Sequence, residues 1–147
     1  MYKYFDESYR KDCRKQLVNY IYNKLKKTKC PTKIWAFIIK ACHFTFPYLT
    51  LIVFLSSPIW IGIITLFMVL FFLLMYIYLK GCFVSHLEYK LNKKNFINIV
   101  DPYLILMDYP INNESRYIGT FIIGLFYFSL IILILYIRLK WINFIKN

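Results

Sequence analysis

The chain has 147 residues, 60% of which are hydrophobic, and its 19 lysines and arginines give it a net charge of +12. Soluble domains are roughly 45–50% apolar, and a chain of this length could not bury so large an excess. The composition therefore excludes an ordinary soluble domain. No nucleic-acid-binding motif and no Gly-rich phosphate loop accompanies the charge, so we expect no nucleic-acid partner.

Residues 1–33 predict a basic, amphipathic N-terminal arm. Apolar side chains recur at helical spacing from Ser8 to Lys27, although Arg14 and Lys24 interrupt the apolar stripe. Ten of the 19 basic residues precede the first apolar run, against three carboxylates. A basic helix of this kind lies on a membrane surface and binds anionic lipid headgroups. Docking to a protein partner is the alternative.

Three apolar runs predict transmembrane helices over residues 34–55, 59–79 and 118–137. Each has about 20 residues, which is enough to cross a hydrocarbon core of about 30 Å. Only Ser56-Ser57-Pro58 separates the first two runs, so these helices form a tight antiparallel hairpin. The expected fold is all-α: an integral membrane domain over residues 34–147.

The basic residues also predict the topology. Their excess before the first span places the N-terminus in the cytosol, or on the interior side of a virion. The loop 80–117 then lies on the same side, and the C-terminus lies opposite, although Arg138, Lys140 and Lys146 near that end are basic. Asn113-Glu114-Ser115 is a glycosylation sequon that this orientation leaves unmodified. A re-entrant first segment would turn the sequon outward.

Two ionisable residues in the first span are functional candidates, as intramembrane charges generally are. Lys40 and His43 are three residues apart and share a helical face, and Pro47 follows one turn later, where it predicts a kink. Lys40 is close enough to the end of the span to extend to the headgroups. His43 is a packing residue, a ligand or a proton carrier. One hypothesis is therefore a small channel or proton pathway through both residues.

A cluster of polar and reactive side chains follows the second span. Ser85 and Glu88 fit a capping box at the start of a short helix that reaches about Asn92, a purely structural role. The functional alternative is a membrane-embedded metal or redox site, because thiolate, imidazole and carboxylate bind zinc and related metals. Its candidate residues are His43, Cys82, His86 and Glu88. His43 and Cys82 are the candidate metal ligands, and we expect no other cofactor.

Asp101-Pro102 predicts a second short helix, with Asp101 as N-cap and proline in the first turn. The apolar segment Tyr103–Tyr109 continues this helix, and Pro110 ends it. A helix of about this length cannot cross the bilayer, so it lies in the interface or enters and leaves on one side.

The segment from Cys82 to Glu88, after a hairpin with His43 in its first helix, resembles a signature of small uncharacterised bacterial membrane proteins. That family carries Cys-Pro-Leu-Thr-x-Trp/Leu-Glu; this chain keeps Cys82, Ser85, Leu87 and Glu88 but has phenylalanine in place of proline. Residues 100–102 and 112–117 are similar to membrane proteins of giant DNA viruses, whose AT-rich genomes also fit the abundance of Ile, Phe, Tyr, Lys and Asn in this chain. The resemblance covers about residues 35–120 and implies a polytopic helical fold without an established activity.

These observations favour a small multi-pass membrane protein with a structural or interaction role, in a viral or host endomembrane bilayer. Its expected partners are the lipid bilayer, anionic lipid at the N-terminal arm, and a protein partner or a second copy of itself. A non-enzymatic role is favoured over catalysis.

Overall fold

The structure is a computed structural model that describes residues 6–93 and 96–146, with side chains up to Trp141. The first five residues of the predicted arm and the side chain of Lys146 lie outside this description. The described residues form helices and no strand: α1 (Glu7–Lys26), α2 (Thr32–Ser56), α3 (Ile59–Tyr78), α4 (Phe83–Leu91), α5 (Asp101–Leu106) and α6 (Asn113–Lys146).

Three of these helices are long and apolar enough to cross a membrane: α2, α3 and the part of α6 up to Trp141. In α2 and α6 only 6% of the most apolar stretch is buried inside the structure, so the remaining apolar surface requires lipid to cover it. The predicted all-α class with three spans is confirmed. The helix α6 begins five residues before the predicted third span, at Asn113.

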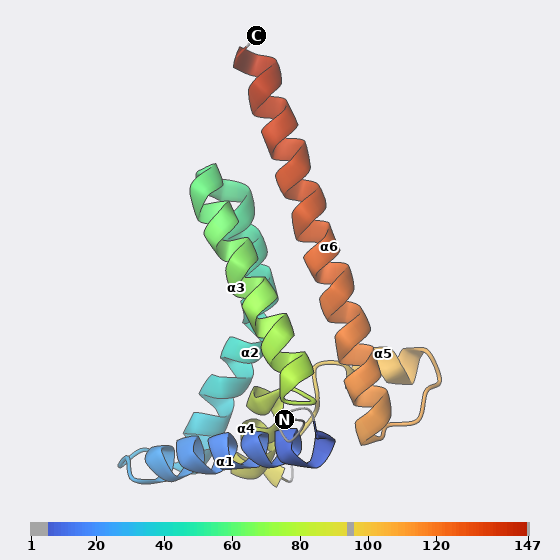
Figure 1. The fold of residues 1–147 in the computed structure, drawn as a ribbon. Helices are drawn as coiled ribbons and strands as arrows, with labels where there is room; N and C mark the ends of the chain where they lie inside the picture. The colour runs from blue at the N-terminus through green and yellow to red at the C-terminus, as the bar shows by residue number, and fades with distance from the viewer. Residues whose placement is uncertain (1–5, 94–95, 147) are drawn as a thin grey trace.

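The three long, apolar helices α2, α3 and α6 rise together from a broad base (Figure 1). We call these three helices the stem. Helix α1 runs across the lower ends of the spans, α4 lies next to α1, and α5 lies beside the lower part of α6. We call this base, residues 6–33, 79–93 and 96–117, the foot. The C-terminus lies at the opposite end of α6.

Helices α2 and α3 form the predicted tight hairpin, which α6 clamps at its turn. The turn consists of Ser57 and Pro58, and Phe54 beside it is fully buried. Arg138 of α6 donates to the carbonyl oxygens of Phe54 and of Ser57, the latter at 2.6 Å. Backbone carbonyls at the turn have no helical partner, so the guanidinium satisfies them and holds α6 in place.

A polar contact in the middle of the stem joins α2 to α6. Pro47 lies inside α2, and the hydroxyl of Tyr127 donates to its carbonyl oxygen at 2.7 Å. Thr50, which also contacts Tyr127, donates to the carbonyl of Phe46 at 2.9 Å. Polar groups in hydrocarbon need partners within the protein, so this contact fixes the register of the two spans.

The foot has its own small core, in which α1 packs against α4 and α2. Val18 of α1 is buried together with Ala36, Leu87 and Leu91. The side chain of Asp6 accepts the Ser8 N–H at 3.2 Å and caps α1. This packing pins the amphipathic helix to the ends of the spans. The division into a 1–33 arm and a 34–147 membrane domain stays a prediction.

The expectation that Asp101 caps its helix is wrong. Val100 is the N-cap of α5, and Asp101 is the first helical residue. Its buried carboxylate pairs with both sides of the Arg116 guanidinium, at 2.8 and 2.9 Å, and accepts the Asn98 N–H at 2.8 Å. A bidentate ion pair is stronger than a cap hydrogen bond, so the tertiary partner takes the carboxylate and ties α5 to α6.

Candidate functional site

A thiol and an imidazole from different helices meet where the stem joins the foot. Cys82 Sγ lies 3.5 Å from Nε2 of His43. Lys80 and Gly81, with φ angles of 53° and 134°, turn the chain sharply out of α3. This left-handed turn, which glycine favours, places Cys82 directly at the start of α4, facing α2. The structure thus brings together two of the four residues of the predicted cluster.

Cys82, and not Ser85, is the N-cap of α4, so the predicted capping box is wrong. Ser85 is the third helical residue, and no side chain caps the helix. The chain enters the helix three residues earlier than expected because the turn at Gly81 has already reversed its direction. Ser85 is buried and contacts Cys82 instead. The helix ends at Leu91, close to the predicted Asn92.

The surroundings of Cys82 favour its thiolate. Burial by itself raises the pKa of the thiol, but the hydrogen bond and charge of His43, with two hydrogen bonds from Ser85, outweigh it and hold the pKa below its ordinary value. The start of a helix also stabilises a negative charge. The His43–Cys82 pair therefore resembles the arrangement that activates a nucleophilic thiol.

Glu88 lies near His43 and interacts with it electrostatically. Its side chain is only 3% exposed, and burial raises the pKa of the carboxyl, against the opposing charges of Lys40 and His43. The Nδ1 atom of His43 is buried and has no hydrogen-bond partner among the described residues. The carboxyl of Glu88 thus adds negative charge near the ring without a hydrogen bond to it.

The four predicted residues do not form one ligand set. The Nδ1 atom of His86 lies 3.1 Å from the backbone carbonyl oxygen of Cys82, so this ring contacts the backbone of Cys82, whereas His43 contacts the thiol. Within the described parts of the chain, no three His, Cys, Asp or Glu side chains are arranged to hold a metal ion. His43 and Cys82 form a pair only, and the four-residue metal site is therefore not supported by the geometry. The proton pathway through Lys40 and His43 stays a prediction.

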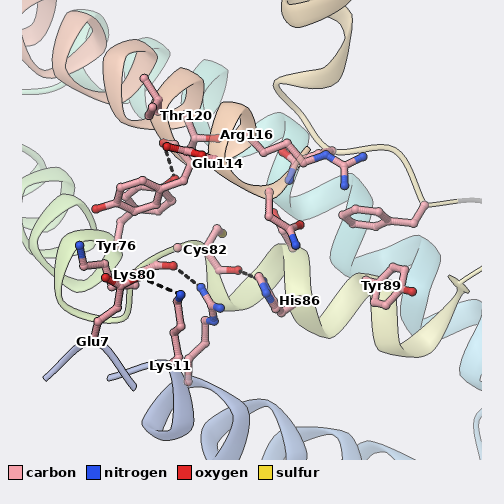
Figure 2. Close-up of a pocket in the computed structure, with 18 residues that line it drawn as sticks. Glu7, Lys11, Tyr76, Lys80, Cys82, His86, Tyr89, Glu114, Arg116 and Thr120 are labelled. Atoms are coloured by element: carbon pink, nitrogen blue, oxygen red, sulfur yellow. Dashed lines mark hydrogen bonds and ion pairs between the residues drawn. The ribbon is translucent and has the colours of Figure 1, made fainter. Parts of the chain in front are cut away.

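A pocket of about 940 Å³ lies beside Cys82, between α1 and the starts of α4 and α6 (Figure 2). We call it the foot pocket. Its wall contains the rings of Tyr76 and Tyr117, which stack with centroids 5.2 Å apart. Its charged lining residues are four cations and two carboxylates: Lys11, Arg14, Lys80, Arg116, Glu7 and Glu114.

Two of these cations are already neutralised within the foot. Lys11 pairs with Glu7 at 2.8 Å, and Arg116 pairs with Asp101. The ammonium group of Lys80 lies 5.6 Å from the centroid of the Tyr117 ring, which is a cation–π contact and leaves the charge in place. Of the remaining charged lining residues, Arg14 and Lys80 are positive and Glu114 is negative, so the foot pocket keeps an excess of one positive charge.

Arg14 is the cation in the foot pocket with the poorest partners. It is partly buried, and its guanidinium donates to the carbonyl oxygen of Lys80. Its Nε is buried without a hydrogen-bond partner, and no carboxylate of the described residues forms an ion pair with it. Burial lowers the pKa of the guanidinium. The sequence carried one signal of this role: a cation on the apolar face of an amphipathic helix.

Comparisons with models of known protein families, with curated proteins and with solved structures found no match for this chain. The resemblance to small bacterial and viral membrane proteins therefore stays a prediction.

Proposed function

We propose that this multi-pass membrane protein binds the phosphate-bearing headgroup of an anionic lipid in the foot pocket, and that its role is structural or interactive. The single observation that carries this proposal is Arg14: a partly buried guanidinium with an unpaired Nε and no carboxylate partner among the described residues. Taking a charged group out of water costs several kcal/mol unless an opposite charge compensates it. An anion bound in the foot pocket would supply that charge.

The shape of the guanidinium favours phosphate as the anion. Arginine presents a planar fork of donors that matches two phosphate oxygens, and Lys80 adds a second cation on the same wall. The stacked rings of Tyr76 and Tyr117 also line the foot pocket, and the Tyr117 ring lies next to the Lys80 ammonium group. Tyrosine prefers this position between hydrocarbon and water, which is the level of the headgroups.

The position of the foot pocket favours a lipid over a soluble phosphate. Its walls include Tyr76 and Thr120, from the last turn of α3 and the beginning of α6, and Lys11 from α1 below (Figure 2). A ligand at this level has its charged part in the foot pocket and its apolar part beside the spans. In this arrangement the basic arm attracts anionic lipid to the foot pocket, since anionic lipid gathers at basic segments next to spans.

The proposed orientation places the foot on the cytosolic side, or the interior side of a virion, because the foot contains most of the basic residues. The similarity of residues 100–102 and 112–117 to viral membrane proteins favours a viral or endomembrane bilayer. Self-association or a protein partner at the foot is compatible with lipid binding and is not needed for it.

Lipid retention in a matched pair of variants tests the proposal. The full chain is reconstituted in nanodiscs of phosphatidylcholine with a minor fraction of phosphatidic acid, extracted, and weighed by native mass spectrometry. Arg14→Gln should lose the retained phosphatidic acid several-fold, while Lys26→Gln should keep it. Lys26 is the matched control because it is an exposed cation of the same helix, outside the foot pocket.

Two results would overturn this function. Equal lipid retention by Arg14→Gln and Lys26→Gln would show that binding is a general effect of positive charge. Displacement of phosphatidic acid by millimolar inorganic phosphate would show that the foot pocket takes a soluble phosphate instead of a lipid.

A further inference from the structure

Lipid binding leaves one arrangement in the molecule without a use: the contact between Cys82 and His43. The two side chains come from different helices and meet at 3.5 Å. The thiol stands at the N-terminus of the nine-residue helix α4, next to the buried Ser85. A structural cysteine in an apolar core needs none of these polar neighbours, and buried thiols without them are inert.

These neighbours are what a nucleophilic thiol requires. The imidazole of His43 can accept the proton of Sγ, and the free N–H groups at the start of α4 stabilise the thiolate that remains. Cys82 also lines the foot pocket, so a molecule bound there can reach it. The pair therefore combines a general base, His43, with a thiolate that the helix start stabilises, and the foot pocket gives a ligand access to it.

The position of Cys82 selects the class of substrate. It lies four residues after Tyr78, the last residue of α3, and so at the border between hydrocarbon and headgroups. The carbonyl carbon of a long-chain acyl thioester lies at this border when its chain is in the bilayer. Cysteines next to spans are the usual acceptors of such chains.

We propose that the His43–Cys82 pair makes this protein self-acylating, with Cys82 as the acceptor of a long-chain acyl group from an acyl thioester. His43 Nε2 takes the proton of Cys82, and Sγ attacks the carbonyl carbon of the donor. The carbon–sulfur bond of the donor breaks, and its departing thiolate takes the proton back from His43. One thioester is exchanged for another, and nothing is oxidised or reduced.

The foot pocket also indicates which acyl thioester is the donor. This inference rests on the proposed anion binding of the foot pocket. Fatty acyl-coenzyme A carries its thioester on a phosphate-bearing nucleotide. Arg14 and Lys80, which line the foot pocket together with Cys82, would hold those phosphates while the flexible pantetheine arm folds within the pocket. A donor without phosphates would lack this contact and react more slowly.

The test uses the purified full chain in phosphatidylcholine nanodiscs, incubated with palmitoyl-coenzyme A and followed by intact mass. We expect one added palmitoyl group that hydroxylamine removes, and peptide mapping of the wild-type protein should place it on Cys82. Cys82→Ser should abolish the mass shift. His43→Gln, which keeps a hydrogen-bonding side chain but no base, should slow it by about 100-fold, the lower range of general-base catalysis.

The control variant is Cys42→Ser. Cys42 is exposed and adjacent to His43 in sequence, so a reaction governed by exposure to lipid would modify it first. We expect Cys42→Ser to react like the wild type. Acylation mapped to a cysteine other than Cys82, no acylation at all, or an unchanged rate in His43→Gln would each overturn the proposal.

A second donor separates this proposal from the lipid function. Palmitoyl-N-acetylcysteamine carries the same acyl group without phosphates, and we expect it to react more slowly than palmitoyl-coenzyme A, with no further loss in Arg14→Gln. Equal rates would overturn the phosphate contact and leave the His43–Cys82 chemistry intact. Retained phosphatidic acid without any acylation would overturn the chemistry and leave the lipid function intact.

Discussion

The foot and the hairpin turn are each held to α6 by an arginine, and the two arginines are used differently. At the foot, Arg116 binds the buried carboxylate of Asp101 with both sides of its guanidinium. At the turn, Arg138 binds two backbone carbonyls and no carboxylate of the described residues. Arg14 has one such carbonyl and an unpaired Nε. Of these three guanidinium groups, that of Arg14 therefore has the fewest partners within the fold, and it is the one to which we assign a ligand.

The largest effect is expected when the buried ion pair of the foot is broken. Asp101→Ala leaves the charge of Arg116 without its partner, which costs about 3 kcal/mol for a pair that is partly shielded from water. Thermal unfolding in detergent should show a clearly lower Tm. The double variant Asp101→Ala, Arg116→Met should recover part of the loss, and a Tm equal to that of wild type in the single variant would contradict the assigned role.

Removing the clamp at the hairpin turn should cost less. Arg138→Ala gives up its hydrogen bonds to the carbonyls of Phe54 and Ser57 and should destabilise the protein by about 2 kcal/mol, the range for bonds to a charged group. Lys140→Ala removes an exposed cation two residues later and is the control. If both variants unfold at the same temperature, the arginine is not a clamp.

The polar contact between α2 and α6 in the middle of the stem should contribute still less to the free energy of unfolding. Tyr127→Phe keeps the ring and deletes the hydroxyl that donates to Pro47, so we expect a loss of about 1 kcal/mol, as for other hydrogen bonds between spans. Tyr136→Phe, on an exposed part of the same helix, should change nothing. The stability of both variants is measured by unfolding in a titration with denaturing detergent. If Tyr127→Phe is as stable as the wild type, this contact does not determine the register of the two spans.

Alkylation of Cys82 should depend on pH less steeply near neutrality than alkylation of free cysteine. Its pKa lies below the ordinary value, so thiolate persists as the pH falls through the range where a free thiol, with a pKa of about 8.5, becomes protonated. His43→Gln removes the main favourable neighbour and should shift the rate profile to higher pH. A wild-type profile that matches free cysteine would refute the activated thiol.

The proposed orientation, with the foot on the cytosolic side, predicts that the sequon at Asn113 is not glycosylated. Asn113 begins α6 at the foot, so it should stay unmodified when the chain is inserted into glycosylation-competent microsomes. A sequon engineered beyond residue 147 should be glycosylated and serves as the positive control. A glycan on Asn113 would place the foot outside and reverse the proposed topology.

The local composition of the chain alone determined the membrane part of the fold. Apolar runs of sufficient length form helices in lipid because every backbone polar group must be satisfied within the segment, and a three-residue connection allows only a hairpin. These features do not depend on distant residues, and the structure has the same spans within a few positions, apart from the extended α6.

Only the tertiary structure decided what the polar residues do. Ser85 and Asp101 match local capping patterns, yet a turn at Gly81 moves one helix start and Arg116 takes the carboxylate of Asp101. The contact between Cys82 and His43 exists because α4 packs against α2, and Arg14 becomes significant because its burial removes it from water. A side chain binds the strongest partner within reach, and which partners are within reach is set by packing between segments far apart in the sequence.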